Sequence, residues 1–80
     1  MLLLGVDYMI DYLPFWSTLE HSTENTYTLT AKHKLSSSTI DRLRHNKDLS
    51  TKTLNDLCRI LNCRIEDICI YVPSEYDQQL

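Results

Sequence analysis

Apolar residues recur along most of this chain at the three- and four-residue spacing of a helix, and seldom at the alternating spacing of a strand. In residues 26–46, Leu29 and Leu35 precede Ile40 and Leu43, so two short segments each carry one apolar face that can close on the other. This pattern predicts two short helices joined by a tight turn. Such a pair forms a helix-turn-helix motif.

Residues before the motif predict another helix. Pro14 suits the first position of a helix, because its missing N–H has no partner there in any case. Phe15, Trp16 and Leu19 then supply an apolar face, for which we expect core packing. The polar residues 20–25 should form a loop that leads into the motif.

Capping residues mark where the other helices begin. Asn25 and Ser36 precede the two helices of the motif, and each side chain can accept a hydrogen bond from a first-turn backbone N–H. Ser50 suits the same position in a later helix, where Leu49 and Leu54 form a hydrophobic staple around the cap. The inward stripe of this helix is Leu54, Leu57, Cys58 and Leu61, and Asn62 is a suitable left-handed stop.

A last helix is expected after residue 64. Ile65 and Ile68 begin it at helical spacing, Ile70 or Val72 completes it, and Pro73 prevents its continuation. The chain has 80 residues with 1 glycine and 2 prolines, which favours one compact helical domain. We therefore predict an all-α fold with five helices.

The outer face of the second motif helix is polar and basic. Ser37 and Ser38 stand at its start, and Arg42 and His45 follow about one and two turns later. A helix of this kind, with its N-terminal end pointing outward, suits entry into a DNA major groove.

Charge is distributed unevenly along the chain. The net charge of -3 and the pI near 5.4 alone argue against nucleic acid. Residues 1–31 and 65–80, however, contain acids and no Lys or Arg, whereas residues 32–47 have five cations against Asp41 alone, a net +4. A solvated helix surface would explain a charge run by itself. Because this run coincides with the motif, we favour a DNA-contacting face.

Two stretches carry a resemblance to a known family. The run L-T-A-x-x-x-L-S-S-S-T-I-D-R-L-R-H-N-K and the following S-T-K-T-L-N-D-L-C-R-I-L-N-C-R-I-E-D-I resemble the XRE family, the Cro and phage-repressor type of helix-turn-helix domain. The resemblance spans about Tyr12 to Val72. It implies a lambda-repressor-like fold and binding to double-stranded DNA.

The resemblance also implies which residues contact DNA. Bases would be read by the first two residues after the helix cap and by one a turn later, which are Ser37, Ser38 and Arg42. Arg42 would dominate, because arginine can pair with both O6 and N7 of guanine. Contacts to the DNA backbone, or auxiliary contacts, fall to Asn25, Thr26, Tyr27, Thr39, Arg44, His45 and Lys47.

The chain departs from the family pattern at several positions. Lys34 and Asn46 stand where relatives usually have glycine, and both sites should need a left-handed backbone. Arg44 replaces a glutamate that in relatives pairs with an internal arginine. We expect that salt bridge to be absent and Arg44 to be free for solvent or phosphate.

Three parts of the chain are expected: an N-terminal extension at 1–11, the helix-turn-helix domain at 12–73 and a flexible acidic tail at 74–80. Relatives often begin near Met-Ile-x-Tyr, which Met9–Tyr12 matches. We therefore expect the first eight residues to be an extension that precedes the family domain. Leu2–Leu4 is too short for a membrane span and has no basic flank or cleavage site. We expect a cytoplasmic protein with no membrane contact.

Cofactors and catalysis find no support in the sequence. Cys58, Cys63 and Cys69 are odd in number and suggest reduced thiols. Zinc held by cysteines with His33 or His45 is the alternative, but the spacing matches no structural zinc pattern, so we expect no metal and no cofactor. Without a glycine-rich phosphate loop or a nucleophile near a base, we expect no enzyme activity.

Three functions fit these observations. The first is a transcriptional regulator, expected to be a repressor, that binds a palindromic operator as a homodimer through the helix 37–45. The second is an antitoxin or mobile-element control protein that binds both DNA and a cognate protein partner. The third is a protein-interaction module without DNA affinity, which the net acidity would favour. For a dimer, an isologous contact through Ile70 and Tyr71 is preferred.

Overall fold

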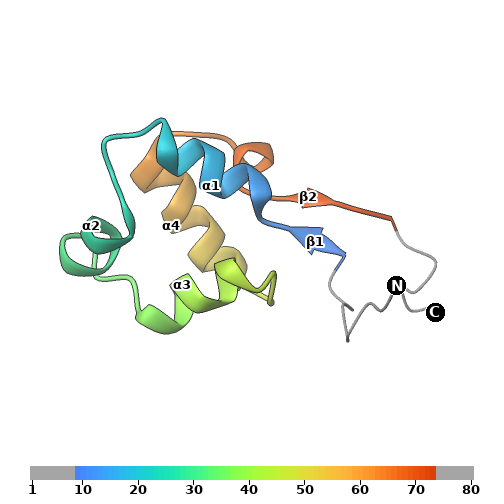
Figure 1. The fold of residues 1–80 in the computed structure, drawn as a ribbon, viewed down its shortest axis with the longest axis horizontal. Coiled ribbons are helices and arrows are strands. Elements are labelled where there is room, and N and C mark those ends of the chain that lie inside the picture. Colours follow the sequence, from blue (N-terminus) through green and yellow to red (C-terminus); the bar gives the residue numbers. More distant parts are fainter. Residues whose placement is uncertain (1–8, 74–80) are drawn as a thin grey trace.

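Four α-helices and a two-stranded ribbon make up residues 9–73, which are the part of the chain that the computed structural model describes (Figure 1). The helices are α1 (Leu13–Glu20), α2 (Thr26–Ala31), α3 (Ser37–Arg44) and α4 (Thr51–Leu61). A 3₁₀ turn, η1 (Ile65–Asp67), follows α4, and the strands are β1 (Ile10–Asp11) and β2 (Ile70–Tyr71). Helix-turn-helix geometry is present, but neither the fifth helix nor an all-α fold is confirmed.

The segment after α4 forms a turn and a strand where we expected a helix. The Asp67 carboxylate accepts a hydrogen bond from the backbone N–H of Arg64 at 3.0 Å, which caps the start of η1, and the helix ends at Asp67 after a single turn. The residues that follow are mostly β-branched or aromatic, and such side chains favour extended backbone. Helical spacing of isoleucines was therefore a misleading signal in this short run.

The ribbon joins the two ends of the described chain. Ile10 pairs with Tyr71 and Asp11 with Ile70 in an antiparallel register, and the Val72 N–H donates to the Met9 carbonyl at 2.7 Å. Met9 is itself buried, so the last residues of the expected extension pack against the folded domain. The remaining residues of that extension, 1–8, and the expected tail, 74–80, lie outside the described residues.

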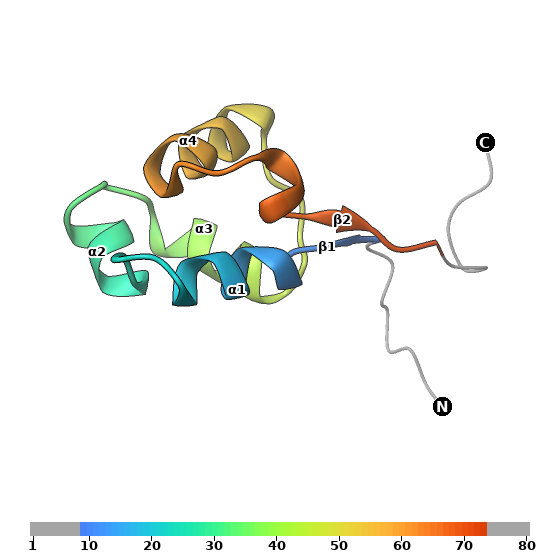
Figure 2. The same ribbon diagram turned by 90° about the horizontal axis from the view of Figure 1, so that it is seen from above.

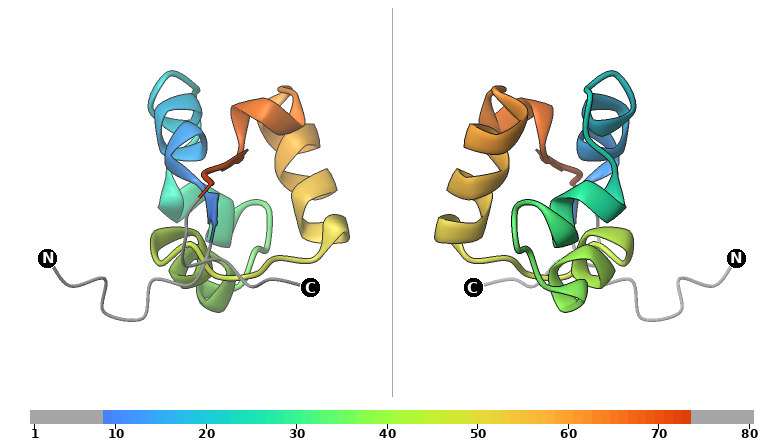
Figure 3. Two further views of the ribbon diagram at one scale, coloured as in Figure 1. Left: turned by 90° about the vertical axis from the view of Figure 1, so that its right-hand side faces the viewer. Right: turned by 90° about the vertical axis from the view of Figure 1, so that its left-hand side faces the viewer.

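All four helices and the turn after η1 contribute residues to one core. Phe15 of α1, Leu29 of α2, Leu43 of α3, Leu57 of α4 and Ile68 are all fully buried. Helices α1 and α4 stand side by side, and α3 runs across one end of the pair (Figure 3). Seen from above, η1 bridges α1 and α4 beside the ribbon (Figure 2). This packing leaves one side of α3 exposed.

Capping residues hold the helix starts as predicted. The Asn25 side-chain oxygen Oδ1 accepts from the Thr28 N–H at 2.9 Å, and the Thr28 hydroxyl oxygen accepts from the Asn25 N–H at 2.8 Å. Ser36 and Ser50 accept from the third residue of α3 and α4, both at 3.1 Å. Helix α1 begins at Leu13, so Pro14 lies in its first turn, one position later than expected.

Within residues 9–73, three residues other than glycine adopt left-handed backbone, and each follows a helix end or bends the motif turn. They are Lys34 with φ 65°, Asn46 with φ 54° and Asn62 with φ 52°. Left-handed geometry costs an ordinary residue about 1–2 kcal/mol, and asparagine tolerates it best after glycine. The predictions of left-handed backbone at Lys34, Asn46 and Asn62 are therefore confirmed.

None of the helices in residues 9–73 has the length and apolar character that crossing a membrane requires.

Candidate nucleic-acid interface

Helix α3 presents a polar face to solvent because its apolar residues are used by the core. Ile40 and Leu43 are buried, and Leu35, just before the helix, packs against the same core. The Leu35 N–H donates to the Leu29 carbonyl at 3.0 Å, which closes the turn between α2 and α3. The motif predicted from residues 26–46 is therefore present, with α3 as its outer helix.

The three residues assigned to base reading lie together on this face. Ser37, Ser38 and Arg42 are all exposed, on the first two turns of α3. Neither serine hydroxyl makes a hydrogen bond within residues 9–73, so both can bond a ligand. The Arg42 guanidinium donates to the Asp48 carbonyl at 3.3 Å, an exposed bond that Arg42 would exchange for one to a base.

The three auxiliary residues of α2 differ in what they can offer. Tyr27 is 74% exposed, and its ring stands clear of the core. Thr26 is half-buried at the start of the helix. The Asn25 side chain already caps α2, so its role in the structure is to stabilise the start of that helix.

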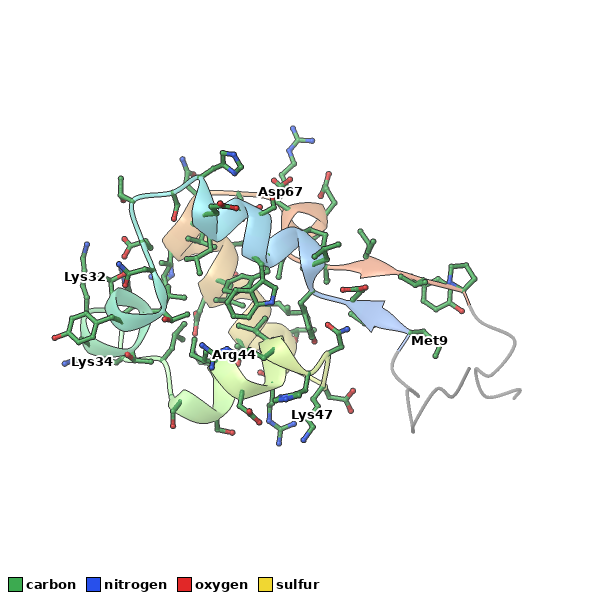
Figure 4. The ribbon with its side chains drawn as sticks, in the orientation of Figure 1. Met9, Lys32, Lys34, Arg44, Lys47 and Asp67 are labelled. Atoms are coloured by element: carbon green, nitrogen blue, oxygen red, sulfur yellow. The ribbon has the colours of Figure 1, made fainter. Side chains whose placement is uncertain are left out.

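The auxiliary residues of α3 and of the loop that follows it differ in their contacts. The Thr39 hydroxyl bonds the Ser36 hydroxyl at 3.1 Å and is half-buried. His45 Nδ1 lies 2.9 Å from the Asp41 carbonyl and 3.2 Å from its carboxylate. Lys47 is exposed and labelled in Figure 4.

Arg44 does not stand free, as the sequence suggested, but contacts an aromatic ring. Its guanidinium carbon lies 5.8 Å from the centroid of the Trp16 ring. The glutamate that the family resemblance implies at this position could not make a cation–π contact. Sequence reasoning missed it because Trp16 and Arg44 are distant in the chain and no local spacing links them.

Tyr12 fixes the loop after α3, which sequence reasoning also missed. Its hydroxyl donates to the Lys47 carbonyl at 2.8 Å, and its backbone N–H donates to the Asn46 side-chain oxygen at 3.0 Å. Tyr12 is 3% exposed, and burial raises the pKa of its phenol above the ordinary value of 10.0. The phenol therefore stays a hydrogen-bond donor, and Lys47 projects from a braced loop.

Glu24 braces the turn of the motif from the other side. Its carboxylate lies 3.2 Å from His33 Nε2 and 3.5 Å from Lys32 Nζ, and its side chain is only 11% exposed. A hydrogen bond from Thr28, followed by one from His33, lowers the pKa of this carboxyl below its ordinary value. The charge on Glu24 thus ties the loop before α2 to the turn after it.

Ion pairing divides the cations of the chain into two groups. The chain contains eight Lys and Arg, and four of them pair with carboxylates at 3.0–3.8 Å. The paired cations are Lys32, Lys52, Arg59 and Arg64. The other four, which have no carboxylate partner within residues 9–73, are Lys34, Arg42, Arg44 and Lys47.

All four unpaired cations belong to the motif turn, α3 or the loop after it. Lys34 and Lys47 lie beyond opposite ends of α3, while Asp67 lies at the far side of the molecule (Figure 4). Unpaired positive charge that surrounds exposed serines is suited to an anionic polymer. We call Ser37, Ser38 and these four cations the α3 surface.

A comparison with family models agrees with this geometry. The model of the Cro/C1-type helix-turn-helix DNA-binding domain matches residues 16–74, which is most of the chain. The chain belongs to this family. Membership in the Cro/C1-type family confirms the resemblance found in the sequence and identifies a DNA-binding domain, with α2 and α3 as its helix-turn-helix. No curated protein and no solved structure gave a significant match.

Proposed function

We propose that this protein is a sequence-specific transcriptional regulator that places α3 in the major groove of double-stranded DNA. The observation that carries this proposal is the distribution of unpaired charge on the α3 surface. Four cations without carboxylate partners flank two exposed serines on a helix that the fold leaves uncovered. Unpaired cations can release counterions from DNA without first breaking an internal ion pair.

In this proposal the bases are read from the start and the middle of α3. Ser37 and Ser38 bond base edges or phosphates with little selectivity, whereas Arg42 pairs with guanine and supplies about 1–3 kcal/mol of discrimination. The bond from Arg42 to the Asp48 carbonyl is exposed, so exchanging it for a base contact costs little.

Backbone contacts come from the edges of the same surface. Lys47 binds phosphates on one side of the groove, with His45 beside it. Thr26 and Tyr27 lie at the start of α2 and reach the phosphates on the other side, where Arg44 lines the same pocket. Asn25 and Thr39 support these contacts by capping α2 and by bonding the α3 cap.

We further infer a homodimer that acts as a repressor on a palindromic operator. Ile10, Ile70 and Val72 are each at least 40% exposed on the ribbon, beside a groove of about 520 Å³ that Leu49 and Leu54 help to line. A two-stranded ribbon is marginal alone, and pairing through Ile70 and Tyr71 of a second copy would extend it. Light scattering tests this, since a dimer has twice the 9.4 kDa mass.

The experiment compares two substitutions on the α3 surface. Arg42→Ala should relax the preference at one base pair in each half-site, because it removes a reading contact. Lys47→Ala should weaken all duplexes alike and reduce the dependence of log affinity on log salt by about one unit. Binding titrations on duplexes that differ at single base pairs measure both effects. Identical behaviour of the two variants would contradict the separation of reading from positioning.

A further inference from the structure

The Trp16 ring packs against the core and lies next to Arg44 of the α3 surface. The indole meets the ring of Phe15 edge to face, with centroids 4.8 Å apart and planes at 77°. Phe15 is fully buried, and Trp16 is half-buried against the same core. The contact with Phe15 and the partial burial therefore restrict the rotation of the indole relative to α1.

The Arg44 guanidinium lies over the Trp16 ring, and its hydrogen-bonding groups are unused. The guanidinium carbon lies 5.8 Å from the ring centroid, within the range of a cation–π contact. Within residues 9–73 the guanidinium makes no ion pair and no hydrogen bond. A guanidinium over a ring uses its flat face, so its N–H groups at the edge stay available for an oxyanion.

The space next to Arg44 is lined by hydroxyl groups. A pocket of about 330 Å³ lies between α2 and α3 and is lined by Arg44 and Ile40 together with Thr26, Tyr27, Thr30 and Ser37. The Thr30 hydroxyl already donates to the Thr26 and Tyr27 carbonyls. The Arg44 guanidinium and the three other hydroxyls, which make no hydrogen bond within residues 9–73, therefore remain available at this concavity. Such a set suits a phosphate, which accepts several hydrogen bonds at once.

We propose that Trp16 is a positioning residue for DNA binding: it holds the Arg44 guanidinium at this pocket, where Arg44 binds a backbone phosphate. The proposal rests on the proposed function and adds a residue that lies outside the α3 surface. A free arginine loses rotamer freedom when it binds. Contact with the indole removes part of that freedom before DNA arrives, so less is lost on binding.

The test is a double-mutant cycle on the whole chain with a mixed-sequence DNA duplex as probe. Arg44→Gln should lower affinity and reduce the slope of log affinity against log salt by about 0.9, the value of one phosphate contact. Trp16→Leu should lower affinity about two- to fivefold in the presence of Arg44 and leave it unchanged in the Arg44→Gln background. Trp16→Phe should restore part of the loss, because it keeps an aromatic face.

Lys47 supplies the matched control. It lies on the α3 surface but has no ring contact, so the effects of Trp16→Leu and Lys47→Gln should add. Far-UV circular dichroism shows that each variant folds, and Trp16→Phe serves if Trp16→Leu does not. The chain has 1 tryptophan, so indole emission reports this contact directly and should change in Arg44→Gln.

Three outcomes decide the matter. Coupling between Trp16 and Arg44, with additivity between Trp16 and Lys47, supports the inference. Duplex binding in which Trp16→Leu has the same effect with and without Arg44 overturns it and leaves the proposed function standing. No duplex binding by the wild-type protein at low salt overturns the proposed function, and the inference with it.

Discussion

Two asparagines in left-handed backbone provide a matched test of how the loop after α3 is held. Asn46 and Asn62 have φ of 54° and 52° and follow the ends of α3 and α4. They differ in one respect: the Asn46 side-chain oxygen accepts a hydrogen bond from the Tyr12 N–H at 3.0 Å, whereas the Asn62 side chain makes none within residues 9–73. Substituting glycine at each site separates the backbone effect from the hydrogen bond.

The expected magnitudes follow from these contacts. Asn62→Gly should change the free energy of unfolding by no more than ~0.5 kcal/mol, because glycine relieves left-handed strain but adds entropy to the unfolded chain. Asn46→Gly has the same backbone effect and also leaves the N–H of Tyr12, a residue 3% exposed, without its partner. An unsatisfied buried group costs about 1–3 kcal/mol, so the two variants should differ by that amount.

Urea unfolding followed by circular dichroism measures both variants against the wild-type protein. In thermal unfolding, a loss of 1 kcal/mol in a domain of this size lowers the melting temperature by about 4–8 °C. Asn46→Gly should also weaken duplex binding, because Lys47 is the next residue in the loop that Asn46 and Tyr12 hold. Equal stability of the two variants would refute the role given to the Tyr12–Asn46 bond.

Two further predictions concern titration and assembly. Burial, and to a smaller extent the neighbouring Cys58 thiol, raises the pKa of Cys63 from 9.0 to about 11. The neutral thiol therefore contributes its full stability below pH 9.0, and this contribution is lost as the pH rises through about 11. Under reducing conditions, urea unfolding should therefore show a smaller alkaline loss for Cys63→Ala than for the wild-type protein; equal losses would contradict this. If the proposed dimer forms through the ribbon, Ile70→Glu should give a monomer of 9.4 kDa in light scattering with the helical content unchanged, whereas a persistent dimer would exclude the ribbon as the interface.

Signals that act over a few residues predicted the structure well. The caps at Asn25, Ser36 and Ser50 each depend on one side chain and a backbone N–H three residues later, so sequence is sufficient to find them. Left-handed backbone was predicted at Lys34 and Asn46 because the family resemblance implies glycine at both positions. Glycine at such a position indicates a backbone conformation that other residues adopt less easily.

Signals that depend on distant residues could not be found in this way. The segment 65–72 has apolar spacing that fits a helix, but pairing with Ile10–Asp11 selects an extended strand. The hydrogen bond from the Tyr12 hydroxyl to the Lys47 carbonyl joins residues 35 positions apart, so no local sequence pattern predicts it. For the candidate site, the sequence predicted which residues of α3 are exposed, but it did not predict the contacts of Tyr12 and Trp16 that brace this region.

The most direct test of the central claim is selection of bound sequences from a random duplex library at two salt concentrations. We predict an enriched palindrome with guanine at a fixed position in each half, half-sites about 34 Å apart, and weaker retention at the higher salt concentration. Repeating the selection with Arg42→Ala should abolish the guanine preference. Failure to enrich any sequence, with no retention at the lower salt concentration, would contradict the assignment of the α3 surface to DNA.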